Sequence, residues 1–205
     1  MVLLERYFRY ADGVVPNLLA LTVTVGGWPL GIAMMAADAW PLRIAGFLLT
    51  SLALVWSAYY LHEFAHYAIF RSPAANRRWG TLMTWINGSC VAQFDELRKK
   101  HMRHHIERAD VITFDVQAWL RRAPAPVRAL VLLLEWLYFP AVEFLMRGFV
   151  IARAWNKGGR RRLRVVTVLA LRAAGFALLA AVSPVALLLY FAAYLLMITV
   201  LRFAD

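Results

Sequence analysis

Long runs without a charged residue limit what this chain can fold into. Val14–Ala37 spans 24 residues without a charge, and Ile44–Leu61 adds 18 more. A helix rises about 1.5 Å per residue, so about 20 apolar residues cross the hydrocarbon core of a bilayer. Residues 14–37 and 44–61 are therefore predicted to form two membrane-spanning helices joined by a short turn.

A second pair of candidate spans lies near the C-terminus. Val165–Val182 and Val185–Leu201 flank Ser183-Pro184, and a Ser-Pro pair favours a turn. Ala173–Leu201 could instead form one uncharged helix, but a single span needs fewer residues than this run contains, so a hairpin is expected. The first helix of that hairpin carries Arg172, which must reach the membrane surface or find a polar partner.

The distribution of basic residues predicts the orientation of four spans. Arg6 and Arg9 precede the first span, and 18 basic residues lie between Arg71 and Arg164. Positively charged loops stay in the cytoplasm, so both termini and residues 62–164 are expected there or at the interface. This is typical of a multi-pass membrane protein. The net charge of +11 suits an anionic membrane surface, and no nucleic-acid-binding module is visible.

Two segments between the hairpins are predicted to lie in or near the interface. Trp79–Phe94 is uncharged but contains several polar residues, so we expect a buried or interfacial helix that does not span. Pro126–Arg147 gathers its charged residues on one face of an ideal helix, which predicts an interfacial helix kinked at Pro140. Cys90, the only cysteine, is expected to be an inert packed thiol.

All five histidines fall in two clusters. The first holds His62 and His66, and the second holds His101, His104 and His105. Positions i and i+4 share one face of a helix, and i, i+3 and i+4 fall within an arc of about 100°. The first cluster ends the second predicted span, and the second follows in the same compartment. Because imidazole binds iron, zinc and copper, the two clusters predict a metal site at the membrane surface.

The chemistry of that site has alternatives at this point. His62-Glu63-Phe64-Ala65-His66 is an H-E-x-x-H sequence, in which two histidines bind zinc and the glutamate acts as general base of a membrane metalloprotease. Such a protease needs one further ligand, whereas the second cluster offers three imidazoles, and five imidazoles suit two metals. The ferritin-like di-iron pattern is disfavoured because no second E-x-x-H occurs. A non-catalytic membrane metal-binding protein is the third possibility.

Both clusters also resemble a known family. His62-x3-His66 and His101-x2-His104-His105 look like the first two histidine boxes of the integral membrane fatty acid desaturases and their hydroxylase relatives. Ile106–Asp115 resembles the stretch after the second box in bacterial members, and Leu201–Asp205 resembles the approach to the third. The expected fold class is thus an all-α integral membrane domain over residues 1–205. It has two transmembrane hairpins, and its cytoplasmic or interfacial helices carry the histidine-rich site.

The resemblance implies a specific chemistry. Two non-haem iron ions would activate dioxygen, the co-substrate, and a double bond would be introduced into an alkyl chain carried by a membrane lipid, coenzyme A or acyl carrier protein. Electrons would come from a separate donor such as a ferredoxin, a rubredoxin or a cytochrome b5-like protein, because no His-Pro-Gly-Gly haem motif occurs. The implied iron ligands are His62, His66, His101, His104 and His105.

Two further features bear on partners and on completeness. A basic cluster next to the second box could attract an acidic electron donor or an acyl-carrier phosphate, although anionic lipid explains the same charges. This cluster consists of Arg98, Lys99, Lys100, Arg103 and Arg108. The third histidine box of the family is absent, since no histidine follows His105. We therefore expect the C-terminal part of the domain to be missing, so that either the chain is a truncated product or the remaining ligands come from elsewhere. On its own, the chain is expected to bind iron weakly and to be inactive.

Overall fold

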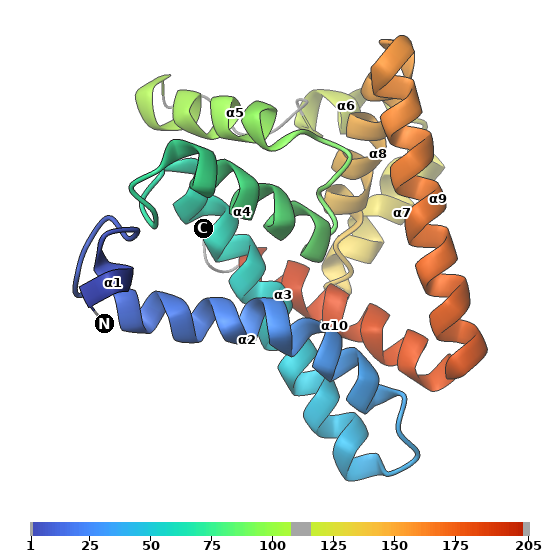
Figure 1. The fold of residues 1–205 in the computed structure, drawn as a ribbon. Helices are drawn as coiled ribbons and strands as arrows, with labels where there is room; N and C mark the ends of the chain where they lie inside the picture. Colours follow the sequence, from blue (N-terminus) through green and yellow to red (C-terminus); the bar gives the residue numbers. More distant parts are fainter. Residues whose placement is uncertain (1, 108–115, 203–205) are drawn as a thin grey trace.

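The structure is a computed structural model, and it describes residues 2–107 and 116–202 (Figure 1). Within these ranges the chain is helical apart from turns and one antiparallel bridge between Phe8 and Phe70. The helices are α1 (Val2–Glu5), α2 (Val14–Met35), α3 (Trp40–Ala65), α4 (Pro73–Ile86), α5 (Phe94–Glu107), α6 (Val116–Arg122), α7 (Ala125–Trp136), α8 (Ala141–Asn156), α9 (Gly159–Val182) and α10 (Pro184–Arg202).

Four helices, α2, α3, α9 and α10, are long and apolar enough to cross a membrane. The predicted all-α fold with four spans is therefore confirmed. The turn of the first hairpin is shorter than predicted, because α3 already begins at Trp40 with Pro41 in its first turn, a position that favours proline. Arg43 then lies in the helix, and its Nε donates a hydrogen bond of 2.7 Å to the carbonyl of Ala37.

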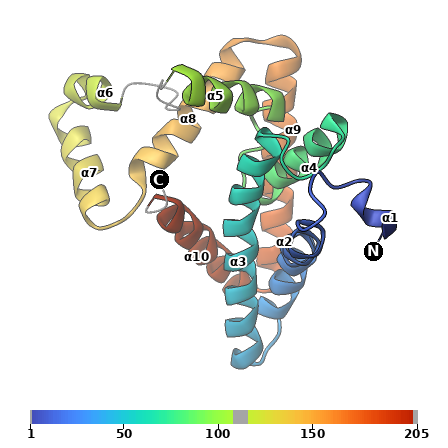
Figure 2. The ribbon, with the colours of Figure 1, turned by 90° about the vertical axis from the view of Figure 1, so that its left-hand side faces the viewer.

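Helix α3 is the centre of the molecule and packs against α2, α4, α5 and α10 (Figure 2). Its crossing with α2 relies on two glycines. A Cβ added at Gly46 would lie 2.6 Å from the carbonyl oxygen of Gly31, so neither position has room for a side chain. Small residues at such crossings let the backbones of membrane helices approach closely. The α2–α3 hairpin therefore gives the rest of the fold a fixed support.

The second hairpin turns where the sequence predicts. Ser183 has an extended backbone between α9 and α10, and its hydroxyl accepts a hydrogen bond of 3.2 Å from the N–H of Ala186. Arg172, inside α9, also has the partner that its depth requires. Its guanidinium donates to the carbonyl of Trp85 and, over 3.5 Å, to the thiol of Cys90. The buried cysteine thus links α9 to the segment between α4 and α5.

The prediction of one helix over Trp79–Phe94 is wrong. Helix α4 ends at Ile86 and α5 starts at Phe94, with a turn between them. Gly88 stops α4, because its φ of 84° is a left-handed conformation that glycine adopts without strain. The side chain of Asn87 accepts hydrogen bonds from the backbone N–H and the hydroxyl of Ser89, which stabilises the turn.

The prediction of one kinked helix over Pro126–Arg147 is also wrong. The chain forms two separate helices, α7 and α8, on either side of Leu137–Pro140. Tyr138 ends α7 with a φ of 60°, and Pro140 directly precedes α8. Glu135 reaches across the break and accepts a hydrogen bond of 2.7 Å from the N–H of Val142. A left-handed residue followed by a proline turns the chain more sharply than a proline kink alone.

The turns of both hairpins lie on the lower side of the molecule in Figure 1, and α4 and α5 lie on the upper side. The N-terminal segment also reaches the upper side, where Arg9 donates a 3.1 Å hydrogen bond to the carbonyl of Tyr67. Arg71 donates a 2.8 Å hydrogen bond to the carbonyl of Phe8. These bonds fix the loop that follows α3, next to the first histidine cluster.

Candidate metal centre

The first histidine cluster occupies the C-terminal end of α3. His62 lies in its last turn, and His66 is the residue at which the helix ends. Tyr67 follows with a φ of 55°, and the N–H of Ala68 donates to the carbonyl of Glu63 over 3.0 Å. This is the hydrogen-bond pattern of a left-handed helix C-cap, here formed without glycine. It stops the helix directly after the two histidines.

The second cluster is carried by α5, which rests on α4. The ring of Phe94 covers Gly80 so closely that a Cβ at this glycine would clash with the ring. An ion pair of 3.0 Å joins Arg77 Nε to the carboxylate of Asp95. Because both contacts lie at the first turn of α5, they fix the helix at the end opposite to its histidines.

A third contact holds α5 against α3. The guanidinium of Arg98 lies 4.1 Å from the centre of the Tyr67 ring, within the range of a cation–π interaction. Arg98 is one helical turn before His101, and Tyr67 follows His66 directly. The stacking therefore joins the two histidine-bearing segments beside the cluster. Sequence analysis missed this pair, because no linear pattern relates a tyrosine to an arginine on another helix.

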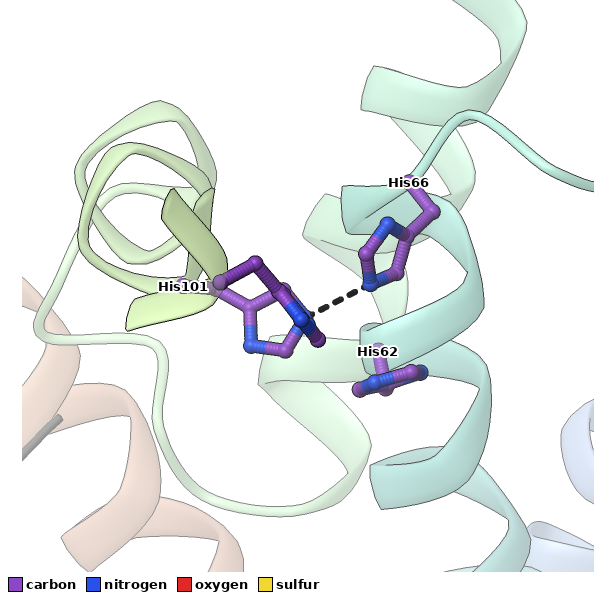
Figure 3. A group of neighbouring side chains, drawn as sticks. His62, His66 and His101 are labelled. Atoms are coloured by element: carbon purple, nitrogen blue, oxygen red, sulfur yellow. Dashed lines mark hydrogen bonds between the residues drawn. The ribbon is translucent and has the colours of Figure 1, made fainter. Parts of the chain in front are cut away.

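The structure brings four of the five predicted histidines together. Nε2 of His101 lies 2.8 Å from Nε2 of His66 (Figure 3). Nε2 of His105 lies 3.0 Å from Nε2 of His101. His62 completes the group, and the candidate ligand atoms of all four lie within 4.8 Å of one another. The side chain of His104 lies outside the described residues. His62 and His105 are exposed, and His66 and His101 are half-buried.

These distances suit the coordination shell of a metal ion. Two imidazole nitrogens bound at about 2.1 Å to one ion lie roughly 3.0–3.4 Å apart, close to the spacings in this cluster. Burial lowers the pKa of His66, and the neighbouring rings of His62 and His105 lower it further. A low pKa favours the neutral imidazole, which is the form that binds metal. The donor set therefore fits iron, zinc or copper.

The four described rings form one compact group and not two separate ones. Two ions would therefore need donors beyond them, with His104 the nearest in sequence. Glu63 does not belong to this group of candidate ligands. Its Oε1 lies 3.1 Å from Nδ1 of His62, which leaves Nε2 of that ring available to a metal. A carboxylate in this position orients the histidine and fixes its tautomer.

Comparison with known proteins shows the family to which the chain belongs. A sequence model of the fatty acid desaturase family matches residues 38–205, which include all five histidines. The chain belongs to the fatty acid desaturase family. Membership in this family supports an oxidoreductase that acts on lipid, and it gives no support to the metalloprotease interpretation. Neither the curated proteins nor the solved structures gave a significant match.

The basic cluster of this desaturase-family chain does not form one surface. Arg98 stacks on Tyr67, and Arg103 is exposed. Lys99 and Lys100 line a pocket on another side of α5, next to α8 and α9. Arg108 lies outside the described residues. The described charges that the sequence places together therefore lie in separate surroundings.

Proposed function

We propose that this chain binds two iron ions and acts as an oxygen-dependent desaturase on the alkyl chain of a membrane lipid or an acyl carrier. The observation that carries the proposal is the convergence of His62 and His66 with His101 and His105 at the end of an apolar span. An all-imidazole donor set at this position suits a redox metal that must meet an alkyl chain. Family membership supports iron over zinc.

The proposed iron ligands are all on α3 and α5. Bound iron would supply the reduction of dioxygen and the removal of hydrogen from an unactivated C–H bond. Over the whole reaction, dioxygen takes two electrons and two protons from outside and two hydrogen atoms from the alkyl chain, which leaves two waters and one double bond. The ligands are His62, His66, His101, His104 and His105.

Other residues of the chain would hold and shield this centre. Glu63 would accept the Nδ1 proton of His62 and so present Nε2 to the metal. Arg98 and Tyr67 would keep α5 in place against α3. An apolar pocket of about 510 Å³ between α2, α4, α9 and α10 offers an alkyl chain a place among the spans, with Trp28 and Phe176 in its lining.

Five imidazoles are few for two iron ions, so the proposal includes further donors of the paired-histidine type that the family resemblance implies. It also includes a cytoplasmic position for the centre, in a bacterial inner membrane with both termini inside. Soluble electron carriers could then reach the exposed rings of His62 and His105 directly. The electron donor would be a separate ferredoxin, rubredoxin or cytochrome b5-like protein.

Expression in a bacterial host fed with deuterated saturated fatty acid tests the proposal. The chain is expressed as it stands and with an appended paired-histidine segment, and host lipids are analysed by mass spectrometry. We expect deuterated unsaturated acyl chains from the form with the appended segment in air but not under anaerobic conditions, and none when that form carries His101→Ala. Iron-loaded protein that yields no unsaturated product in either form contradicts the proposal.

A further inference from the structure

A concave pocket of about 320 Å³ lies between α5, α8 and α9. It shares α5 with the metal centre, since Lys100 faces the pocket and the next residue, His101, faces α3. The lining contains one carboxylate, that of Glu96, together with six basic side chains. The basic residues are Lys99, Lys100, Arg153, Lys157, Arg161 and Arg164.

The one acidic side chain of the lining balances a single positive charge. The carboxylate of Glu96 forms an ion pair with Arg161. Arg164 is held by backbone carbonyls, with hydrogen bonds of 2.8 Å to Cys90 and 3.2 Å to Val91. Carbonyl groups orient a guanidinium without neutralising it, so most of the positive charge in the lining is not balanced by an acidic side chain of the lining.

Lys100 shares this lining with Arg153 and Lys157, which carry the same charge. Like charges that converge in a partly buried pocket repel one another, and an anion bound among them removes the repulsion. The pocket is therefore built to hold an anion.

The position of the pocket indicates which anion it meets. Arg161 and Arg164 belong to the first two turns of α9, one of the four candidate spans. Figure 1 shows this end of α9 on the same side as α5, where a span leaves the bilayer. Lipid phosphates lie at that boundary, and basic pockets beside membrane helices bind anionic headgroups. On α9 itself Leu163 and Val166 are 65% and 46% exposed, which gives acyl chains an apolar surface.

We propose that the basic pocket binds the phosphate-bearing headgroup of an anionic phospholipid, whose acyl chains lie along the exposed apolar side of α9. A volume of 320 Å³ equals that of about ten water molecules, enough for a headgroup but not for the acyl chains. The inference does not depend on the desaturase chemistry, because lipid binding is measurable in protein without iron.

Native mass spectrometry of the full chain in detergent tests this proposal. Phosphatidylglycerol is titrated against phosphatidylcholine, which carries a phosphate but no net charge, and against glycerol phosphate, which has no acyl chains. We expect retained adducts of phosphatidylglycerol, with weaker binding of both other probes. Glycerol phosphate that binds as tightly as phosphatidylglycerol would overturn the assignment to a lipid.

Charge variants locate the site. Lys100→Gln with Lys157→Gln is expected to weaken phosphatidylglycerol binding by about tenfold or more, since each basic residue near the surface contributes about 1 kcal/mol. Replacing the same two residues by arginine keeps the charge and should keep the adduct, which separates a binding defect from a folding defect. The matched control removes two exposed charges of α6, by Arg121→Gln with Arg122→Gln. Equal loss in pocket and control pairs would overturn the proposal.

Discussion

His62 contacts the histidine cluster on one side and Glu63 on the other. Its Nδ1 lies 3.1 Å from the carboxylate, so the ring is held in the tautomer that offers Nε2 to a metal. The glutamate of the H-E-x-x-H sequence thus contacts the histidine that precedes it. In a protease this carboxylate would act on a metal-bound water, whereas here it contacts a histidine that is itself a candidate ligand.

Substitution of Glu63 separates these two roles. Glu63→Gln keeps a hydrogen-bond acceptor for His62, so we expect less than the roughly 10–100-fold loss of metal affinity that follows removal of such a partner. His62→Ala removes a ligand and should weaken binding more. Chelator competition measures both affinities. Metal-dependent peptide hydrolysis that disappears in Glu63→Gln, with the metal retained, would contradict the desaturase proposal.

The contact between Tyr67 and Arg98 is also open to a test by substitution. Its ring lies under Arg98 and joins the loop after α3 to α5. Tyr67→Phe keeps the ring, and we expect iron affinity within about twofold of the unmodified chain. Tyr67→Leu removes a cation–π interaction of about 0.5–2 kcal/mol and should lower the affinity several-fold. Both variants retain the same backbone strain, so equal affinities would show that the stacking does not position the histidines.

The position of the metal centre depends on how helix α5 packs against helix α4. Gly80→Leu places a side chain where the Phe94 ring now lies, and overpacking of this kind costs about 1–3 kcal/mol. We expect α5 to shift and metal affinity to fall, while the hairpin α2–α3 keeps its packing. Gly148→Leu in α8 is the matched control, because a Cβ there meets nothing within 4 Å. Equal metal affinity in the two variants would mean that α4 does not position α5.

The sequence predicts well the elements that depend on local composition and on helical geometry. Long apolar runs predict the four spans, and the Ser183-Pro184 turn is found in the structure. The histidine spacing predicts which rings share a face, because that depends on helical geometry alone. Two helix breaks were missed. The Asn87-Gly88 pair is a turn signal within the uncharged run 79–94 that was read as one helix, whereas the break after α7 has a weaker signal. The tyrosine at position 138 adopts a left-handed conformation that sequence patterns reserve for glycine and asparagine.

Contacts between elements far apart in sequence were also beyond prediction. The partner of Arg172 was expected only as a polar group, and the structure supplies Trp85 and Cys90. In the sequence the basic pocket is visible only as the charges around Lys100 on α5. Its other four basic residues are Arg153 on α8, Lys157 directly after α8, and Arg161 and Arg164 on α9. Such sites depend on tertiary packing, which hydrophobic periodicity does not encode.

The whole molecule presents its apolar surface at the spans and its charge at one end. Leu19, Leu48, Leu171 and Leu178 are exposed on three different spans, as expected of side chains that face lipid. The histidine cluster and the basic pocket share the end opposite to both hairpin turns (Figures 1 and 2). In the proposed function, a metal centre at this end would meet the membrane surface on one side and a soluble electron donor on the other.

Labelling of introduced cysteines tests this arrangement. Ala39→Cys lies in the first hairpin turn and Asn156→Cys at the end of α8, and both positions are exposed. We expect an impermeant thiol reagent to label them from opposite sides of the membrane, with position 156 in the cytoplasm. Cys90 is buried, so the unmodified chain should not react and serves as the control. Labelling of both positions from one side would contradict the four-span topology.

Metal analysis of the purified chain tests the central claim most directly, namely that α3 and α5 together hold iron. The account predicts iron as the dominant metal, with up to two ions per chain, and substantial loss when His66 and His101 are each replaced by alanine. Replacement of the exposed Arg128 on α7 by alanine should leave the iron content unchanged. Zinc as the only bound metal, or iron retained in full by both histidine variants, would contradict the account.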